Sequence, residues 1–543
     1  MRVGAAPPPA VLPARAPLRI EGWLAFLLPL AVVSAACVVY LALDLHPVDL
    51  AASTYRANLF ADHGLALWNG NWYGGHYTLS YSVLSPPLTW LFGSVPLEIA
   101  CALISTALFH LLVRRHFGER AAGIGAIWFA LAAGTLVFHG RVPFAIGVSL
   151  GLGALLALQC QRGLIALAFA FLCGLASPVA GLFVALAGVS SALADGLRPR
   201  SGFALAATAL VPVLAIQLAF PEGGQQPYRL SDLAWLVASV AIALVLLPRG
   251  ERALRIGTRL YGLGGLGAYV LSTPLGNNVC RLAPLAAGPL LACVLVSGRA
   301  RRRPALVVAA LLAVLVYFQW KPVVQDVGKV RSDPVVEASY YRPLLGFLGR
   351  AQGPPFRVEI PFTQAHWEAA EVARRFPLAR GWERQLDGTR DALFYGGVLN
   401  RLSYGTWLAE HGVRFVAVAS GKPDYSSYRE RALIETGLPF LKLVWRSREW
   451  RVYEVTLPHA ILIPHGDADM RLVSLGNSAL AIDVRVPGDA TVKVHWSPYW
   501  RARGGCVERA GQWTRVTARR PGTLRVAIDF SPERIFAHGR RCD

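Results

Sequence analysis

The chain has 543 residues, of which 54% are hydrophobic and 16% are charged. This balance excludes a disordered protein, a fibrous repeat and an ordinary soluble enzyme, and it indicates an integral membrane protein. The net charge of +21 does not indicate nucleic acid as a partner, because the basic residues of the first half lie between apolar stretches. Five Lys against 49 Arg are typical of a GC-rich bacterial genome.

Apolar stretches long enough to cross a bilayer, about 20 residues each, follow one another through the first 320 residues. Residues 163–194 are apolar throughout, which is too long for one span, and Ser177 followed by Pro178 supplies a break. Splitting there gives eleven spans, and an unbroken stretch gives ten. The predicted spans are 23–43, 94–113, 121–138, 143–160, two within 163–194, 201–219, 231–247, 255–272, 281–297 and 303–319.

The distribution of arginine tests this count. With a cytoplasmic N-terminus and eleven spans, 17 Arg fall in inner segments and four in outer ones, as the positive-inside rule requires. A single span over 163–194 would move ten of these Arg outside. We therefore expect an α-helical polytopic membrane protein with a cytoplasmic tail at 1–22, a transmembrane domain at 23–320 and an extracytoplasmic C-terminal half. The first span lacks the small-residue cleavage pattern of a signal peptide.

The outer loop at 44–93 is the longest segment between spans in the first half. Its residues 50–67 have a helical apolar pattern that suits a helix lying in the membrane interface. The stretch SVLSPPLTWLFG is too short and too rich in proline to span the membrane, so it re-enters the membrane or lines a cavity. An aromatic belt at headgroup depth is predicted for Trp68, Trp72, Tyr73, Tyr77 and Tyr81.

Asp44 and Asp49 directly follow the first span, with His46 between them. A carboxylate at a lipid–water boundary can act as a general base, because partial desolvation raises its proton affinity. From spacing alone, the commoner alternative is a pair of solvated acids that mark the exit from the membrane.

Other side chains of the same loop have two interpretations each. His63 and His76 are interfacial hydrogen-bonding residues or contacts to a sugar or phosphate. Trp72 and Tyr73 are interfacial anchors or platforms on which a sugar stacks. Both interpretations stay open at this point.

Each outer arginine needs a reason, since it opposes the charge bias of the other loops. The outer set is Arg56, Arg141, Arg229 and Arg281. A phosphate or pyrophosphate headgroup supplies one reason, because a guanidinium makes bidentate contacts with phosphate oxygens. Pairing with a loop carboxylate or an anionic lipid is the alternative. Arg141 and Arg281 are the best phosphate candidates, and Arg56 belongs to the same candidate set.

These features together resemble a known superfamily. A first span that ends at an acid, a large outer loop, many further spans and an extracytoplasmic C-terminal domain are similar to type-C (GT-C) polytopic membrane glycosyltransferases. The run YRANLFADHGLALWNGNWYGGHYTLSYSVLSPPL also resembles bacterial "6-pyruvoyl-tetrahydropterin synthase related" membrane-region proteins. The GT-C resemblance implies a polyprenyl-phosphate sugar donor and a catalytic acid in the first outer loop, here Asp49 first and Asp44 second. The paired-acid signature of better-defined members is absent.

The C-terminal half reads as two units. Strand-like and helical stretches alternate over 321–457, which predicts a linker and a small α/β domain, and period-two runs over 458–543 predict a β-sandwich. Cys506 and Cys542 are the only cysteines of this half, and in an oxidising compartment they are expected to form a disulfide. The aromatics of HWSPYWRARGGC either stack on a glycan or pack around that disulfide, namely Trp496, Tyr499 and Trp500.

The leading hypothesis is a glycosyltransferase that passes a sugar from a polyprenyl-phosphate donor to a cell-envelope glycan or glycolipid. Asp49 would deprotonate the acceptor, and Arg141 and Arg281 would stabilise the departing phosphate. A divalent metal is compatible with this chemistry, and the sequence specifies none. The alternative is a non-catalytic transporter, flippase or envelope-assembly protein whose outer domain binds a glycan or a partner. Apart from that alternative, we expect the C-terminal half to bind the acceptor or to act as a scaffold.

Overall fold

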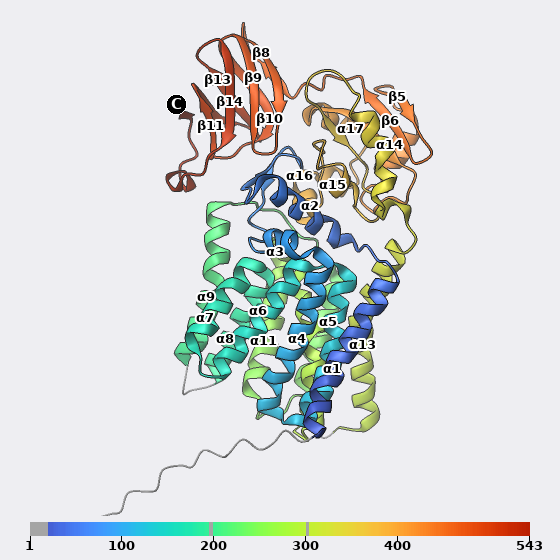
Figure 1. The fold of residues 1–543 in the computed structure, drawn as a ribbon, viewed down its shortest axis with the longest axis vertical. Helices are drawn as coiled ribbons and strands as arrows, with labels where there is room; N and C mark the ends of the chain where they lie inside the picture. Colours follow the sequence, from blue (N-terminus) through green and yellow to red (C-terminus); the bar gives the residue numbers. More distant parts are fainter. Residues whose placement is uncertain (1–19, 195–198, 300–302) are drawn as a thin grey trace, which may run out of the picture.

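The computed structural model describes residues 20–194, 199–299 and 303–543, so most of the predicted tail at 1–22 lies outside the described residues. A helical bundle forms one end of the molecule and two β-rich units form the other (Figure 1). The bundle helices are α1 (Ile20–Ala42), α4 (Ser94–Phe117), α5 (Glu119–His139), α6 (Val142–Gln159), α7 (Gly163–Ala176), α8 (Pro178–Ala194), α9 (Pro199–Ala219), α10 (Leu230–Leu246), α11 (Arg252–Val270), α12 (Leu282–Val296) and α13 (Ala305–Val330).

The bundle is that of a multi-pass membrane protein. Among the described residues, seven helices are long and apolar enough to cross a bilayer, and α7, α8 and α10 are shorter apolar helices. Helix α11 is the remaining one, and it carries Arg252, Arg255 and Arg259 in its first half. A helix thus lies at each of the eleven predicted spans, while the number of membrane crossings and their orientation stay predictions.

The predicted break in 163–194 is present. Helix α7 ends at Ala176, Ser177 is extended with φ −155° and ψ 114°, and α8 begins at Pro178. Proline lacks the backbone N–H of a helix interior and disfavours the helical conformation in the residue before it, which explains the reversal. A Cβ atom added to Gly181 would lie 3.1 Å from the Cα atom of Gly174. The stretch is therefore a tight hairpin of two helices.

Small residues let the helices approach closely around α5, which is the most enclosed of the long spans. A Cβ atom on Gly125 would collide with Cys293 of α12, and one on Gly123 would lie 3.1 Å from the Cβ atom of Ala25 of α1. Close backbone contact of this kind drives helix association in a membrane, because an apolar side chain gains little free energy by moving from lipid into the protein. The alanine and glycine residues of α5 therefore let the neighbouring helices pack closely around it.

Helix α13 continues eleven residues past its predicted end at 319 and rises to Val330 beside the β-rich units (Figure 1). The outer loop lies across the same end of the bundle. It contains α2 (Val48–His63), the two-stranded ribbon β1 (Trp68–Asn69) and β2 (His76–Tyr77), and α3 (Ser85–Phe92). Helix α3 does not cross the bundle, and it exposes Trp90, Leu91 and Phe92.

The environment predicted for the outer loop is wrong. Helix α2 is present, but it lies between the bundle and the C-terminal half rather than in a lipid interface, and most of its residues from Leu50 to Leu59 are buried. The predicted aromatic belt is likewise inside the protein, with Trp68, Trp72, Tyr73 and Tyr77 between 0% and 5% exposed. Aromatic side chains with one polar atom suit a protein interface as well as a headgroup layer, and here the C-terminal half covers them.

Residues 334–455 form an α/β unit. Its four-stranded sheet has the order β3-β4-β6-β5, in which only the β3 and β4 pair is parallel. The predicted alternation of strands and helices is present. The elements are α14 (Ala338–Leu348), β3 (Arg357–Glu359), α15 (Glu368–Glu371), α16 (Arg384–Arg390), α17 (Arg401–Glu410), β4 (Val413–Ala419), α18 (Tyr428–Glu435), β5 (Leu441–Arg446) and β6 (Trp450–Val455).

The last 80 or so residues form two antiparallel sheets of orders β15-β12-β13-β10-β7 and β11-β14-β9-β8. Their alternating apolar side chains face one shared core, as a sandwich requires. The strands are β7 (Leu462–Pro464), β8 (Asp469–Leu475), β9 (Ala479–Val486), β10 (Gly488–His495), β11 (Trp500–Arg503), β12 (Gly505–Ala510), β13 (Trp513–Ala518), β14 (Gly522–Ile528) and β15 (Arg541–Cys542), with the short helix η4 (Pro532–Ile535).

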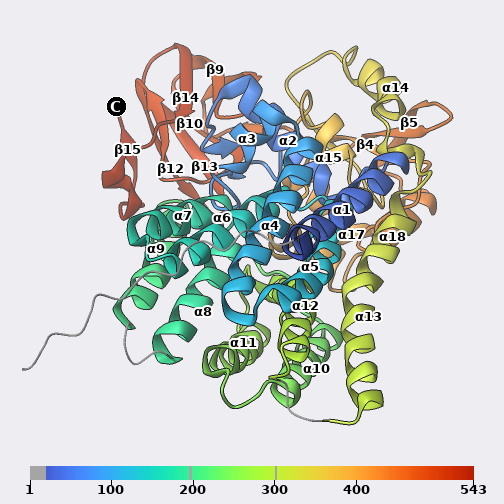
Figure 2. The ribbon, with the colours of Figure 1, turned by 60° about the horizontal axis from the view of Figure 1, so that its bottom comes forward.

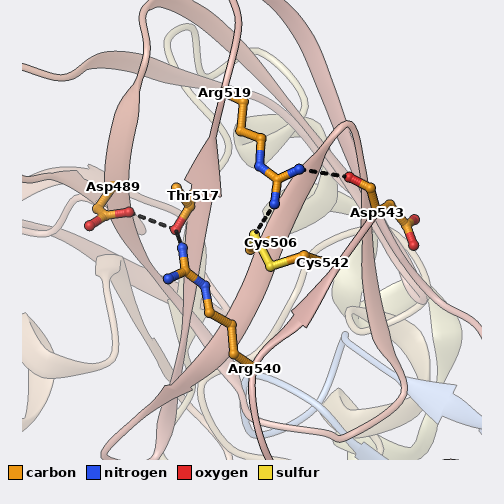
Figure 3. The surroundings of a disulfide bond; sticks show 7 residues. All are labelled: Asp489, Cys506, Thr517, Arg519, Arg540, Cys542 and Asp543. Carbon is orange, nitrogen blue, oxygen red and sulfur yellow. Dashed lines mark hydrogen bonds between the residues drawn. A yellow bond between two sulfur atoms is a disulfide. The ribbon is translucent and has the colours of Figure 1, made fainter.

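Cys506 of β12 and Cys542 of β15 are joined by a disulfide, which Figure 3 shows beside Arg519. The suggestion that Tyr499 and Trp500 stack on a glycan or surround this disulfide is wrong. They are 0% and 2% exposed and belong to the sandwich core. Such large aromatic rings are stabilised by burial in the apolar interior between the two sheets.

Candidate active site

A close approach of two turns brings the predicted catalytic acid to an arginine. Helix α5 ends at His139 and is followed by Gly140, whose φ of +69° is left-handed. A Cβ atom on Gly140 would lie 2.8 Å from the backbone nitrogen of Leu50. The start of α2 therefore packs directly against the turn between α5 and α6. Asp49 directly precedes Leu50, and Arg141 directly follows Gly140. Arg141 Nε lies 3.3 Å from Asp49 Oδ2. The side chain of Asp49 is 34% exposed and that of Arg141 is 25% exposed.

Arg281 completes this group from a third segment. It ends the 3-10 turn Gly276–Arg281 and begins α12, and its guanidinium lies 5.4 Å from the ring centroid of Phe144. It is within electrostatic range of Asp49, Arg141 and Tyr81. No carboxylate in the described part of the chain lies within ion-pair distance of Arg281, so this cation is available to an anionic ligand.

An apolar cavity of about 370 Å³ lies among the bundle helices. Its lining includes Leu282, which follows Arg281, and Gly147, one turn along α6 from Phe144. It also includes Leu247 and Leu254, where α10 ends and α11 begins. Its walls come from α4, α5, α6, α8, α10, α11 and α12 and are almost wholly apolar. The residue directly after Arg281 is therefore part of an apolar cavity of the bundle.

Sequence reasoning missed Glu98, because this single acid lies within an otherwise apolar span. Glu98 is in the first two turns of α4 and is 0% exposed. Its carboxyl group lies within electrostatic range of Asp49 and Arg141. An acid inside a membrane span is costly and marks a functional site or a specific partner. Its position among apolar residues was the signal that could have identified it.

His139 and Asp326 tie a second element to the group. His139 Nδ1 lies 2.8 Å from Asp326 Oδ2, which joins the end of α5 to the extended part of α13. Lys329 Nζ lies 2.7 Å from the other carboxylate oxygen of Asp326. His139 precedes the Gly140 turn, so this pair fixes the turn that carries Arg141.

Asp44 and His46 do not join the Asp49 group. Together with Glu337, which precedes α14, they offer three ligand atoms within 4.8 Å of one another. Two carboxylates and an imidazole suit a divalent transition metal. Asp44 and Glu337 are exposed, and His46 is half-buried with its ring centroid 5.6 Å from that of Trp367. These three residues are the ones that could hold a cation near the start of α2.

Arg56 has a structural partner. Its guanidinium forms a buried ion pair with Glu383 and lies 4.0 Å from the ring centroid of Tyr81. Burial raises the pKa of the Glu383 carboxyl, and the neighbouring Arg56 opposes that rise. Arg56 and Glu383 are each 4% exposed, so the structure commits Arg56 to the contact between α2 and the α/β unit.

The remaining predicted ligands lie away from the group. Trp72 donates from Nε1 to the Ala369 carbonyl at 3.1 Å, and the Tyr73 hydroxyl donates to the Gly381 carbonyl at 2.5 Å. His76 contacts Asn69 and the Tyr77 carbonyl, and burial holds its pKa well below the usual value. The polar atoms of Trp72 and Tyr73 are thus used between the outer loop and the α/β unit, and those of His76 within the outer loop. His63 is exposed at the far end of α2.

The chain is similar to two solved structures and matches no family model. No protein-family model matches the chain, so the "6-pyruvoyl-tetrahydropterin synthase related" label gains no support. No curated protein matches it either. Two crystal structures of ArnT from Cupriavidus metallidurans are similar at 13% identity, each over 80% of this chain and 98% of that one. The TM-score is 0.40 for the apo state and 0.38 for the complex with undecaprenyl phosphate.

Proposed function

We propose that the protein is a GT-C-like membrane glycosyltransferase, which transfers a sugar from a polyprenyl-phosphate donor to a cell-envelope glycan or glycolipid. One observation carries the proposal: Asp49, Arg141 and Arg281 lie within electrostatic range of one another, and Leu282, directly after Arg281, lines an apolar cavity of the bundle. A polyprenyl phosphate has the matching form, an apolar chain that ends in an anion. The outer loop and its position directly after the first span resemble those of GT-C proteins. This resemblance supports the same chemistry.

The proposed mechanism is a single displacement. Arg281 receives the donor phosphate, and a phosphate competes with Asp49 for the guanidinium of Arg141. Asp49 then takes the proton of the acceptor hydroxyl, whose oxygen attacks the anomeric carbon of the sugar. The bond between that carbon and the phosphate oxygen breaks, and the polyprenyl phosphate leaves with its charge held by Arg141 and Arg281. Each of the three residues has one role, and the proton remains on Asp49 until solvent removes it.

The alternative function, movement of a lipid or solute across the membrane, is less well matched. A polar solute needs polar groups along its path, and the walls of this cavity offer almost none. The distribution of arginine supports a C-terminal half outside the cytoplasm, because Arg114 and Arg115 end α4 at the far end of the bundle from the outer loop. The acceptor would then be reached from the outer side.

The test compares envelope glycans and glycolipids among a deletion strain and three complemented strains. The complementing proteins are the wild type, Asp49→Asn and Asp62→Asn at equal membrane abundance. Asp62 is a matched control, since it lies on the same helix and also pairs with an arginine, Arg374, at 3.0 Å. We expect the wild type and Asp62→Asn to restore a missing linkage and Asp49→Asn to leave it absent. Full restoration by Asp49→Asn would overturn the catalytic assignment.

A further inference from the structure

The last residues of the chain form a loop that is fixed at both ends. Asp529 is held by Arg501 at 2.8 Å and by Arg541 at 3.2 Å. At the other end, the Cys506–Cys542 disulfide joins β15 to β12, and Arg519 donates hydrogen bonds to Cys506 Sγ and the Asp543 carbonyl (Figure 3). Residues 530–540 therefore project from the sandwich in a defined position.

This loop exposes apolar side chains that the sandwich could have buried. Phe536 is 74% exposed, which makes it the most exposed aromatic side chain among those that the structure describes, and Phe530 is 41% exposed. Arginine flanks them, since 530–541 contains Arg534, Arg540 and Arg541 against the single acid Glu533. Exposed aromatic rings among basic residues are typical of segments that lie in a lipid headgroup layer.

The loop lies beside the end of a helix of the bundle. Helix η4 contacts α9, and both views show the C-terminal residues next to that helix (Figures 1 and 2). The Tyr499 hydroxyl donates to the carbonyl of Ala219, the last residue of α9, at 2.6 Å. Phe530 lies 5.4 Å, centroid to centroid, from Phe220, which follows α9.

Helix α9 has a face that lipid would cover. Val211, Leu214 and Leu218 recur at helical spacing along it and are 54%, 64% and 58% exposed. The loop thus lies at the end of a membrane-crossing helix, where the contact between Phe530 and Phe220 joins the two. This position favours a lipid bilayer over a protein as the partner of the loop.

We propose that residues 530–540 are a membrane-contact tip. Phe536 enters the lipid–water interface beside α9. Arg540, which is exposed and donates one hydrogen bond to Thr517 Oγ1, contacts a lipid phosphate with its remaining donors. The tip holds the β-sandwich against the bilayer next to its attachment to α9. This proposal is independent of glycosyl transfer, because it rests on the loop and on α9 and uses no residue of the candidate active site.

Photo-crosslinking of the full-length protein in lipid nanodiscs tests it. p-Benzoylphenylalanine replaces Phe536, or its exposed neighbour Ala537 in a second variant that keeps Phe536. Val486 is the control position, because it is 44% exposed and lies at the end of β9 away from the bundle. The opposite end of β9, at Ala479, is the one near the outer loop, since the neighbouring Asn477 contacts Gly70. The nanodiscs contain phosphatidylcholine and phosphatidylglycerol in equal amounts.

We expect phospholipid adducts at both tip positions to exceed those at Val486 at least tenfold by mass spectrometry. We also expect phosphatidylglycerol to exceed its half share among the adducts, because the arginines favour anionic lipid. Tip adducts no more abundant than those at Val486, or adducts formed with protein instead of lipid, would overturn the proposal. Adducts that mirror the bulk lipid composition would overturn the role of the arginines.

Discussion

The buried ion pair of Arg56 and Glu383 should decide whether α2 stays docked. It joins the helix that carries Asp49 to the turn before α16, and each partner is only 4% exposed. Glu383→Gln removes the negative charge and leaves the guanidinium buried without compensation. Breaking a buried pair in this way costs about 3–5 kcal/mol. We therefore expect the free energy of local opening of α2 to fall by that amount.

A second ion pair between the same two segments provides the matched control. Arg374 binds Asp62 through two hydrogen bonds of 3.0 Å, but the side chains are 50% and 39% exposed. Exposed pairs contribute about 0–1 kcal/mol because water and salt screen them. Asp62→Asn should therefore change the opening of α2 far less than Glu383→Gln, although both variants remove one carboxylate charge.

Hydrogen exchange of the α2 amides in nanodiscs measures the difference. A change of 3–5 kcal/mol corresponds to roughly 150- to 5,000-fold faster exchange, and 1 kcal/mol to about fivefold. Adding Arg56→Met to Glu383→Gln should restore part of the protection, since the uncompensated charge is then gone. Equal exchange in Glu383→Gln and Asp62→Asn would refute the reasoning, as would a double variant that is less protected than Glu383→Gln.

Three further outcomes are expected. Arg281→Gln should weaken binding of polyprenyl phosphate at least tenfold while uncharged polyprenol binds as before, and Arg229→Gln, which removes an exposed outer arginine, should change neither in a filter-binding assay. Burial lowers the pKa of His411 from 6.5 to about 3, so the native state binds a proton less readily than the unfolded state. The free energy of unfolding should therefore fall as pH drops below 6.5, by about 2 kcal/mol at pH 5. His411→Phe should flatten that part of the profile of melting temperature against pH. Cys542→Ser opens a cross-link of 36 residues and should cost about 4 kcal/mol of sandwich stability in the chain-entropy model, and an unchanged thermal transition would contradict this.

Periodicity and charge predicted much of the fold. The eleven apolar stretches became eleven helices because length and hydropathy are local properties of the chain. The strands of the C-terminal half followed from alternation in the same way. Asp49, Arg141 and Arg281 were identified because each is an exception to a local rule: an acid at the exit of a span, or an arginine on the outer side. Exceptions of this kind carry information before any contact is known.

The surroundings of the outer loop could not be predicted, because they depend on residues about 300 positions away. Trp72 donates to Ala369 and Tyr73 to Gly381. An aromatic ring with one polar atom fits a headgroup layer and a protein interface equally well. The sequence of the loop therefore could not distinguish a helix on the membrane from a helix covered by a second domain.

These long-range contacts give the α/β unit a definite role in positioning the proposed base. Trp382 Nε1 donates to the Val48 carbonyl at 3.1 Å and Trp367 Nε1 to the His46 carbonyl at 3.3 Å, so two indoles hold the backbone immediately before Asp49. The turn at Gly140 holds it from the bundle side. Because Asp49 is fixed between the two, a lost contact on either side should move the carboxylate relative to Arg141. The α/β unit thus acts as a scaffold for the candidate site.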